Sequence, residues 1–380
     1  MSQWIFILSV AGLFYVYFGY PLLVMLLASF RPRLVNKGDH LPKVTVLIAA
    51  FNEADVISAT VQNKLGLDYP GDLLEIIVVS DGSDDGTDDI VHSVTDPRVK
   101  LLRQQPRAGK TSALNKAVKE AAGEILVFSD ANSLYDQNAL RGLVANFSDD
   151  TVGYVTGKMI YTDADGNPAG DGCSAYMKYE NRLRVAESAI GSIVGVDGGI
   201  DAMRKSLYKS MNADQLPDFV QPLKVVEQKY RVVYEPEALL KEQSLNNADD
   251  EYRMRVRVSL RAFWALFEMR KLLLMRDNVL FSWQLWSHKA LRYLAFIMLI
   301  ALFISNLFIM EKSFFYGVVF ILQLAFYCVA FFAHKIIKNK LLTRTVTFVR
   351  YFALLNLACA HAFTKFIRGK KQVLWIPRKG

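Results

Sequence analysis

Polar and acidic side chains follow three apolar runs in this sequence, and their types suit the binding of a cation or a phosphate. Ala50, Asn52 and Glu53 end the first run, Asp81 ends the second, and Asp130 with Asn132 ends the third. Three acidic clusters in one crevice would repel one another unless a cation or hydrogen-bond donors neutralised them.

Asp130 and Asn132 flank a single residue, so both can offer hard oxygen ligands to Mg²⁺ or Mn²⁺, with diphosphate oxygens completing the shell. Such a triplet is also common as a helix cap. Asp85 or Thr87 of the turn after Asp81 could likewise cap the next helix. A calcium loop of the EF-hand type is excluded because no glutamate falls at the required spacing.

Lys110 stands at the expected start of a helix, after Gly109. The sequence Gly109-Lys110-Thr111 resembles the end of a phosphate-binding P-loop, but the earlier glycine is missing, which excludes a Walker-type ATPase. A lysine at a helix N-terminus still suits a diphosphate through its charge and the exposed amides. The alternative is an ordinary solvated lysine.

Short apolar runs alternate with helical patterns between residues 44 and 129. The runs are Val44–Ala50, Glu75–Ser80 and Glu124–Ser129, and the helical patterns are Glu53–Leu65, Thr87–Val94 and Lys110–Ala122. This alternation predicts βαβ units and an α/β fold with a mostly parallel sheet. The polar clusters would then meet at the carboxyl ends of the strands, where such sheets bind ligands.

Both ends of the chain are predicted to associate with a membrane. Trp4–Phe30 is long enough to cross a bilayer, and Arg31, Arg33 and Lys37 follow at once. An anchor is favoured over a cleaved signal peptide, because a basic n-region and a cleavage site are missing. The positive-inside rule then places the next domain in the cytosol, at the inner or plasma membrane.

Four segments of the C-terminal part have membrane character. Arg253–Arg276 is predicted to be a basic amphipathic helix at the membrane interface, and Ala290–Met310 and Phe314–Ala333 to span. Val346–Phe366 is interrupted by charges and is interpreted as interfacial or re-entrant. The predicted organisation is therefore an anchor over 1–38, a cytosolic domain over 39–250, an amphipathic region over 251–285, and membrane helices with a basic tail over 286–380.

The sequence is 52% hydrophobic and carries a net charge of +8. The excess positive charge lies beside apolar segments, in Arg253–Arg261 and Lys365–Lys379. Membrane lipids and phosphate-bearing substrates explain this placement better than nucleic acid does.

Four motifs in this order, AAFNE, VSDGSDDGT, RAGKTSALN and FSDAN, resemble the family 2 inverting glycosyltransferases. This family includes cellulose, chitin and hyaluronan synthases and bacterial exopolysaccharide transferases. The resemblance implies a GT-A-like nucleotide-diphospho-sugar transferase domain, a UDP- or GDP-linked donor and a divalent metal. It assigns Ala50, Asn52, Glu53, Asp81 and Lys110 to the donor.

The same resemblance assigns Asp130 and Asn132 to metal and diphosphate, with Asn132 standing where the family has a second aspartate. Such a replacement is expected to weaken metal affinity without abolishing it.

The resemblance also covers the acceptor side. Gly198, Gly199 and Arg204 fall in the family's acceptor-side loop, and Asp218 stands where the family has its catalytic carboxylate. One such base suffices for an inverting transfer, because it needs only to take the acceptor's hydroxyl proton. Asp218 could otherwise be a helix cap. Of the family's Q-x-x-R-W motif only Arg257 remains, as a donor-diphosphate ligand, and the missing residues put processivity in doubt.

Several functions stay open at this point. The favoured function is extension of a glycan in exopolysaccharide synthesis, with room for export or assembly partner proteins. One alternative is transfer of a single sugar to a polyprenyl phosphate or another lipid acceptor. Another is a catalytically silent scaffold of a synthase complex. A transporter is poorly supported, because the apolar helices hold no paired charges.

Overall fold

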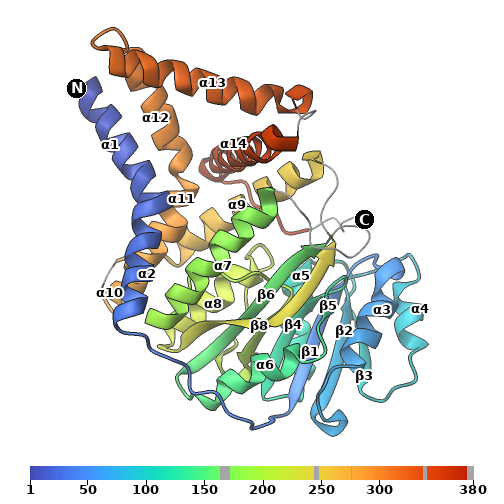
Figure 1. Cartoon of the computed structure of the whole chain (residues 1–380). Coiled ribbons are helices and arrows are strands. Elements are labelled where there is room, and N and C mark those ends of the chain that lie inside the picture. Colours follow the sequence, from blue (N-terminus) through green and yellow to red (C-terminus); the bar gives the residue numbers. More distant parts are fainter. Residues whose placement is uncertain (163–171, 244–247, 275, 337–339, 375–380) are drawn as a thin grey trace.

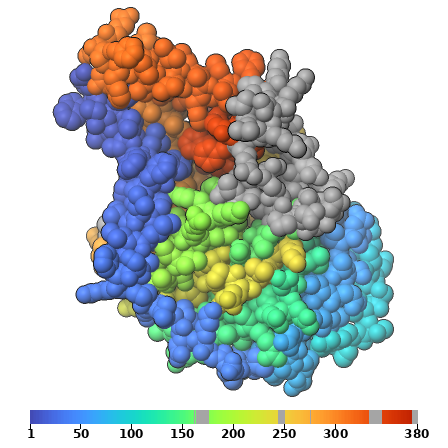
Figure 2. Space-filling view, viewed as in Figure 1, coloured from blue at the N-terminus to red at the C-terminus, as the bar shows by residue number. Residues whose placement is uncertain are grey.

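The computed structural model describes residues 1–162, 172–243, 248–274, 276–336 and 340–374 of the chain. A rounded α/β domain carries a layer of apolar helices on one side (Figure 1). Figure 2 shows the N-terminal helix and α12–α13 projecting from that domain.

The first half of the sheet has the predicted parallel arrangement. β1 (Val44–Ala50) pairs in parallel with β2 (Leu74–Ser80) and with β4 (Ile125–Asp130), and β2 pairs in parallel with β3 (Val99–Arg103). Every residue of β1 and β2 is buried, as expected for strands covered on both faces. The register brings Ala50, Ser80 and Asp130 to one edge of the sheet.

The second half adds antiparallel pairs and makes the sheet mixed, but four of the seven strand pairs in the described residues are parallel, which agrees with the predicted mostly parallel sheet. The full order is β3-β2-β1-β4-β7-β6-β8-β5. β7 (Asp201–Arg204) pairs antiparallel with both β4 and β6 (Val152–Thr162), and β5 (Leu134–Tyr135) pairs antiparallel with β8 (Arg231–Gln243). β6 and β8 are parallel. The apolar runs behind the prediction cover only β1, β2 and β4.

Helices cover both faces of the sheet and enclose two apolar cores. One core joins the sheet to α5 (Lys110–Glu120), α8 (Pro217–Glu227) and α9 (Ala248–Glu268). The other joins it to α3 (Ala54–Leu65), α4 (Thr87–His92) and α6 (Ala139–Ala145). Short 3₁₀ turns occupy Gly71–Leu73, Asn146–Ser148 and Lys205–Leu207.

In the described part of the chain, three apolar helices are long enough to cross a membrane: Ser2–Phe30, Phe314–Phe332 and Thr345–Ile367. The first comprises α1 (Ser2–Phe14), a π-helical turn (Tyr15–Gly19) and α2 (Tyr20–Phe30). The others lie within α13 (Phe314–Ile336) and α14 (Lys340–Ile367). In Figure 1, α1 runs beside α12 (Ala295–Leu307), whereas α13 and α14 lie across them.

Two sequence expectations for this region need correction. The amphipathic helix was predicted over Arg253–Arg276, but α9 begins at Ala248 and ends at Glu268. A 3₁₀ turn follows over Arg270–Leu273. The predicted span Ala290–Met310 is not one helix: α10 (Val279–Gln284), a π-helical turn (Leu285–Ala290) and α11 (Leu291–Tyr293) meet α12 at a bend of 57°. The bent pair is long enough for a fourth crossing only when both parts are taken together.

Buried ionic side chains explain the bend. The His288 ring contacts Glu187 at 2.7 Å and Glu180 at 3.0 Å, and Arg292 donates to Glu180. Both glutamates belong to α7 (Gly172–Ile190). Since these contacts hold the π-helical turn and α11 against the α/β domain, the chain turns at Leu294 to enter the apolar layer.

Candidate active site

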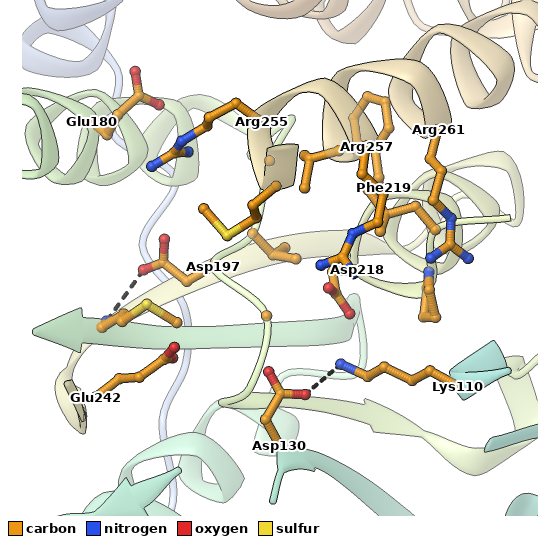
Figure 3. Close-up of a pocket in the computed structure, with 18 of the residues that line it drawn as sticks. Lys110, Asp130, Glu180, Asp197, Asp218, Phe219, Glu242, Arg255, Arg257 and Arg261 are labelled. Atoms are coloured by element: carbon orange, nitrogen blue, oxygen red, sulfur yellow. Dashed lines mark hydrogen bonds and ion pairs between the residues drawn. The ribbon is translucent and has the colours of Figure 1, made fainter. Parts of the chain in front are cut away.

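A cavity of about 340 Å³ lies between the sheet edge and helices α7, α8 and α9. Figure 3 shows Lys110, Asp130 and Asp218 toward one end and Glu180, Asp197 and Arg255 toward the other. Of the residues predicted from sequence, the following line it: Glu53, Lys110, Asp130, Asn132, Gly198, Asp218 and Arg257.

Lys110 and Asp130 form an ion pair at one end of the cavity. We call this end the donor end, because the family resemblance assigns Lys110 to the donor and Asp130 to its diphosphate and metal. β4 presents Asp130 at its carboxyl end, and Lys110 is the first residue of α5. Burial opposes the lysine's charge, but the nearby Asp130 and Asp218 carboxylates hold the pKa of Lys110 above its ordinary value. The lysine is therefore a fixed positive charge at a helix N-terminus, an arrangement suited to phosphate oxygens.

The loop after β4 is held from behind by α3. The Thr60 hydroxyl donates to the Ala131 carbonyl at 2.6 Å, and the buried Lys64 ammonium donates to the Ser133 carbonyl at 2.5 Å. These bonds fix the backbone on both sides of Asn132. The sequence did not single out Lys64, since a fully buried lysine on an apolar helix face is rarely expected.

The donor set at this loop fits a hard divalent cation. Asp130 supplies a carboxylate and Asn132 an amide oxygen, and both line the cavity. Among the described residues no group of three or more His, Cys, Asp or Glu side chains could hold a metal alone. A cation here therefore needs oxygens from a bound substrate, as is usual for Mg²⁺.

Two consecutive glycines bring the carboxylates of Asp218 and Asp130 to the same cavity. Both have positive φ, 74° at Gly198 and 73° at Gly199. A Cβ on Gly198 would lie 2.9 Å from Asp218 Oδ2, and one on Gly199 would lie 3.5 Å from Asp130 Oδ2. Only glycine satisfies the backbone and the close approach together.

Asp218 is the second residue of α8, after Pro217. Its position in the first turn is close to the helix-cap alternative, but the N-cap residue is Leu216, no side chain caps the helix there, and Asp218 lines the cavity. A carboxylate there can accept a proton from a hydroxyl in the cavity.

Arg257 and Arg261 face the cavity from α9, one helical turn apart. Arg261 is held by the carbonyls of Asp214 and Gln215 and by the Thr111 hydroxyl. Burial lowers the pKa of Arg257, but a guanidinium stays charged. Arg261 was missed at sequence level, although its i+4 spacing from Arg257 was a usable signal.

Asp81, Asn52 and Ala50 lie behind the cavity and order its walls. Asp81 is buried and accepts from the backbone amides of Ala108 at 2.8 Å and Gly109 at 2.9 Å. Asn52 exchanges two hydrogen bonds with Asp84. Ala50 is the buried last residue of β1. In this structure these residues therefore shape the loops beside Lys110.

Arg204 does not line this cavity, unlike Gly198 and Asp218, with which the sequence grouped it on the acceptor side. It ends β7 and donates to the carbonyls of Val152 at 2.8 Å and Phe147 at 2.7 Å. The antiparallel direction of β7 separates Arg204 from Gly198 and Gly199, which precede the strand. Its bonds to backbone carbonyls indicate a structural role.

Two further features were not predicted. Asp201, at the start of β7, is buried, and this burial together with the Asp218 charge raises its pKa to about 8. The C-terminal segment passes the donor end: Lys371 pairs with Asp214, and the Val373 carbonyl lies 3.0 Å from where a Gly109 Cβ would be. Contacts this distant in sequence leave no local pattern.

Comparison with known proteins agrees with this geometry. Residues 45–210 match the family "Glycosyl transferase family 2". The chain thus carries a family 2 glycosyltransferase domain and is a glycosyltransferase.

Among similar proteins is the poly-beta-1,6-N-acetyl-D-glucosamine synthase of Staphylococcus epidermidis, 26% identical over 290 residues, covering 72% of this chain and 69% of that one. The synthase of the same name from Staphylococcus aureus is 27% identical over 207 residues, covering 53% and 50%. A solved mannosyltransferase of Pyrobaculum calidifontis, in complex with GDP-Man and Mn²⁺, has a TM-score of 0.75 at 22% identity, covering 97% of this chain and 100% of its own. This likeness shows the GT-A fold with its helices.

Proposed function

We propose that this chain extends a glycan in polysaccharide synthesis, by inverting transfer from a UDP- or GDP-linked sugar at the cytosolic face of the membrane. The similarity to poly-N-acetylglucosamine synthases over more than two thirds of both chains supports the polysaccharide product. The cluster Arg31, Arg33 and Lys37 after the first apolar helix supports the cytosolic orientation.

The donor diphosphate fits between α5 and α9. Lys110 and Arg257 supply positive charge from two sides, and Asp130 with Asn132 would hold Mg²⁺ or Mn²⁺. Such a cation neutralises charge that develops on the leaving diphosphate. Asp81, Asn52 and Glu53 would border the nucleoside, on the loops that lead into the same end of the cavity.

Asp218 is the general base of the proposed reaction. The acceptor hydroxyl oxygen forms a bond to the anomeric carbon as the bond from that carbon to the diphosphate oxygen breaks. The hydroxyl proton passes to Asp218, and the electron pair of the broken bond leaves with the nucleoside diphosphate. Arg257 and Lys110 stabilise the diphosphate as its charge rises.

One observation carries this proposal: the Gly198-Gly199 pair brings Asp218 beside Asp130, with Lys110 and Arg257 in the same cavity. A base, a cation ligand and two phosphate ligands are thus within reach of one bound sugar nucleotide. This combination is what a transferase needs and a scaffold does not.

The test is transfer from radiolabelled UDP- and GDP-sugars by membranes that contain the protein, with products separated by size. We expect metal-dependent transfer that Asp218→Asn abolishes while nucleotide-sugar binding persists. Products of a single added sugar would contradict chain extension. Transfer that survives in Asp218→Asn would contradict the base, and absence of nucleotide-sugar binding would favour a scaffold.

A further inference from the structure

The cavity continues past Asp218 into a second end, which we name the membrane-side compartment. Its walls are Tyr176, Glu180 and Arg184 of α7, Asp197 of the loop before β7, and Lys289 and Tyr293 from the segment that leads into α12. Tyr293 lies two residues before α12, which belongs to the bent apolar pair. The compartment therefore lies at the level where a lipid headgroup would meet the protein.

Two carboxylates of this compartment already have cationic partners from the chain. Asp197 pairs with Arg184 at 2.5 Å, both side chains being less than a tenth exposed. Glu180 pairs with Arg292 and contacts His288 at 3.0 Å. These pairs neutralise each other and leave little demand for a further cation.

Lys289 differs from these cations. Its ammonium lines the compartment, and within the described part of the chain it has no hydrogen-bond partner and no carboxylate within 4 Å. It lies in a π-helical turn, between the fixed His288 and the apolar Ala290. Such turns often mark functional positions, because they redirect one side chain out of the helical pattern.

Gly195 makes room for this ammonium. A Cβ at Gly195 would lie 2.2 Å from Lys289 Nζ, so the lysine reaches over the glycine backbone into the cavity. The Lys289 side chain is half-buried, and an ammonium that faces a cavity without an ion-pair partner favours an anionic ligand there. Phosphate is the anion found at the depth of lipid headgroups.

The loop from Gly195 to Gly198 sets the distance between this cation and the base. Gly195 lies against Lys289, and Gly198 lies against Asp218. Three residues span at most about 10 Å even when fully extended. A phosphorylated mono- or disaccharide can bridge that distance, whereas a bare lipid phosphate at Lys289 would leave no hydroxyl at Asp218.

We propose that the acceptor is a lipid-linked saccharide whose phosphate or diphosphate binds Lys289 and whose sugar hydroxyl faces Asp218. This inference rests on the proposed transferase function and specifies its acceptor. Lys289 is a substrate-binding residue of the membrane-side compartment, and Tyr176 and Tyr293 flank the sugar, as aromatic side chains with an apolar body and a polar tip can.

The test compares two acceptors with the full-length protein in detergent: N-acetylglucosamine linked through a diphosphate to a citronellyl chain, and the octyl glycoside of the same sugar. The quantity measured is the ratio of kcat/KM for the charged acceptor to that for the neutral one. We expect wild type to favour the charged acceptor about ten- to a hundredfold, chiefly through KM, and Lys289→Met to bring the ratio near one. Lys271→Met, an exposed lysine on the neighbouring 3₁₀ turn, is the matched control and should keep the wild-type ratio.

Several results would overturn the proposal. The first is an equal ratio of kcat/KM for the charged and the neutral acceptor in wild type and Lys289→Met. The second is a higher KM for the sugar nucleotide in Lys289→Met, which would mean that Lys289 binds the donor. Faster transfer to citronellyl phosphate than to the glycosylated diphosphate would make the phosphate itself the nucleophile. The last result concerns the neutral acceptor. If phosphatidylglycerol nanodiscs activate transfer to it in wild type but not in Lys289→Met, the site binds a membrane headgroup.

Binding separates this proposal from the proposed function. Affinity of the citronellyl diphosphate sugar, measured without donor, should fall about tenfold or more in Lys289→Met and stay at the wild-type value in Lys271→Met. If wild type binds this acceptor but turns over no sugar nucleotide, the transferase function fails while the acceptor site stands. If wild type transfers sugar but binds both acceptors equally, only the acceptor site fails.

Discussion

Lys110 and Asp130 form an ion pair at the point where the donor diphosphate is proposed to bind. Asp130 and Asn132 are the two proposed ligands of the metal ion, and of these two only Asp130 carries a charge. A metal ion that arrives with the sugar nucleotide must therefore share Asp130 with Lys110. Because of this competition, we expect activity to depend strongly on the concentration of the metal ion.

Asn132→Asp should lower the Mn²⁺ concentration that gives half-maximal activity, by about tenfold, because a second carboxylate adds ligand charge. Asp130→Asn should reduce the rate on the order of 100-fold or more, since several kcal/mol of charge stabilisation are lost. Activity titrated with Mn²⁺ and Mg²⁺ checks both. An unchanged metal dependence in Asn132→Asp would show that this amide is no ligand.

Gly198→Ala should displace the base without removing it. The added Cβ would meet Asp218 Oδ2 at 2.9 Å, and the φ of 74° strains any side chain by roughly 1–2 kcal/mol. Misplacement of a catalytic group by about 1 Å costs on the order of 100-fold in rate. We expect kcat to fall by that order while the Kd of the sugar nucleotide changes little.

Gly86→Ala is the control for Gly198→Ala. Gly86 has a φ of 94°, but a Cβ there meets no atom within 4 Å, so the substitution adds strain without a clash. It should lower thermal stability and leave kcat near wild type. Equal losses of kcat in both variants would attribute the Gly198 effect to backbone strain alone.

Much of the donor end could be predicted because its signals are local. Asp81, Lys110 and Asp130 each follow a buried strand or begin a helix, and parallel strands bring such ends to one sheet edge. The placement of Asp218 depended on family resemblance. In physical terms it depends on Gly198, whose contact with Asp218 crosses 20 positions of sequence and has no periodic pattern.

The membrane-side compartment could not be predicted for a related reason. Lys289 directly precedes the predicted span Ala290–Met310 and carries no sequence signal of its own, because hydropathy averages over a window and ignores single contacts. The bend at Leu294 comes from His288 and Arg292 binding two glutamates on α7, more than 100 positions away. Arg204 shows the opposite case: it is close to Gly198 in sequence, but β7 places it away from the cavity.

Lys64→Met tests whether α3 positions the loop that carries Asn132. The methionine keeps the buried stem but leaves the Ser133 carbonyl without its 2.5 Å donor, at a cost of about 1–3 kcal/mol. We expect the metal concentration for half-maximal activity to rise several-fold. The cation over the Tyr135 ring, 3.6 Å from its centroid, is lost in the same variant.

A stability effect alone would not support positioning by Lys64. Thr60→Val serves as the comparison, because it removes the bond to the carbonyl of Ala131, which lies between Asp130 and Asn132. Both variants should shift the metal titration in the same direction. If each lowers Tm but leaves the metal titration at its wild-type position, α3 supports folding only.

Asp201 should make stability fall as pH rises from about 4 to about 8. Its ordinary pKa of 3.8 describes the unfolded chain, whereas burial and the Asp218 charge raise the pKa in the folded protein to about 8. Between these values the native state holds a proton that the unfolded state has released, so raising the pH favours unfolding, by at most about 1.4 kcal/mol per pH unit. Asp201→Asn cannot titrate and should lose this slope.

The measurement is Tm of the purified protein in detergent at pH 5 and pH 8, with Asp150→Asn, a substitution at an exposed position, as control. Wild type and Asp150→Asn should both lose Tm between the two pH values, and Asp201→Asn should lose markedly less. Parallel curves for all three would mean that Asp201 is ionised in the folded protein, and that a cation or a hydrogen-bond donor then compensates it beside Asp218.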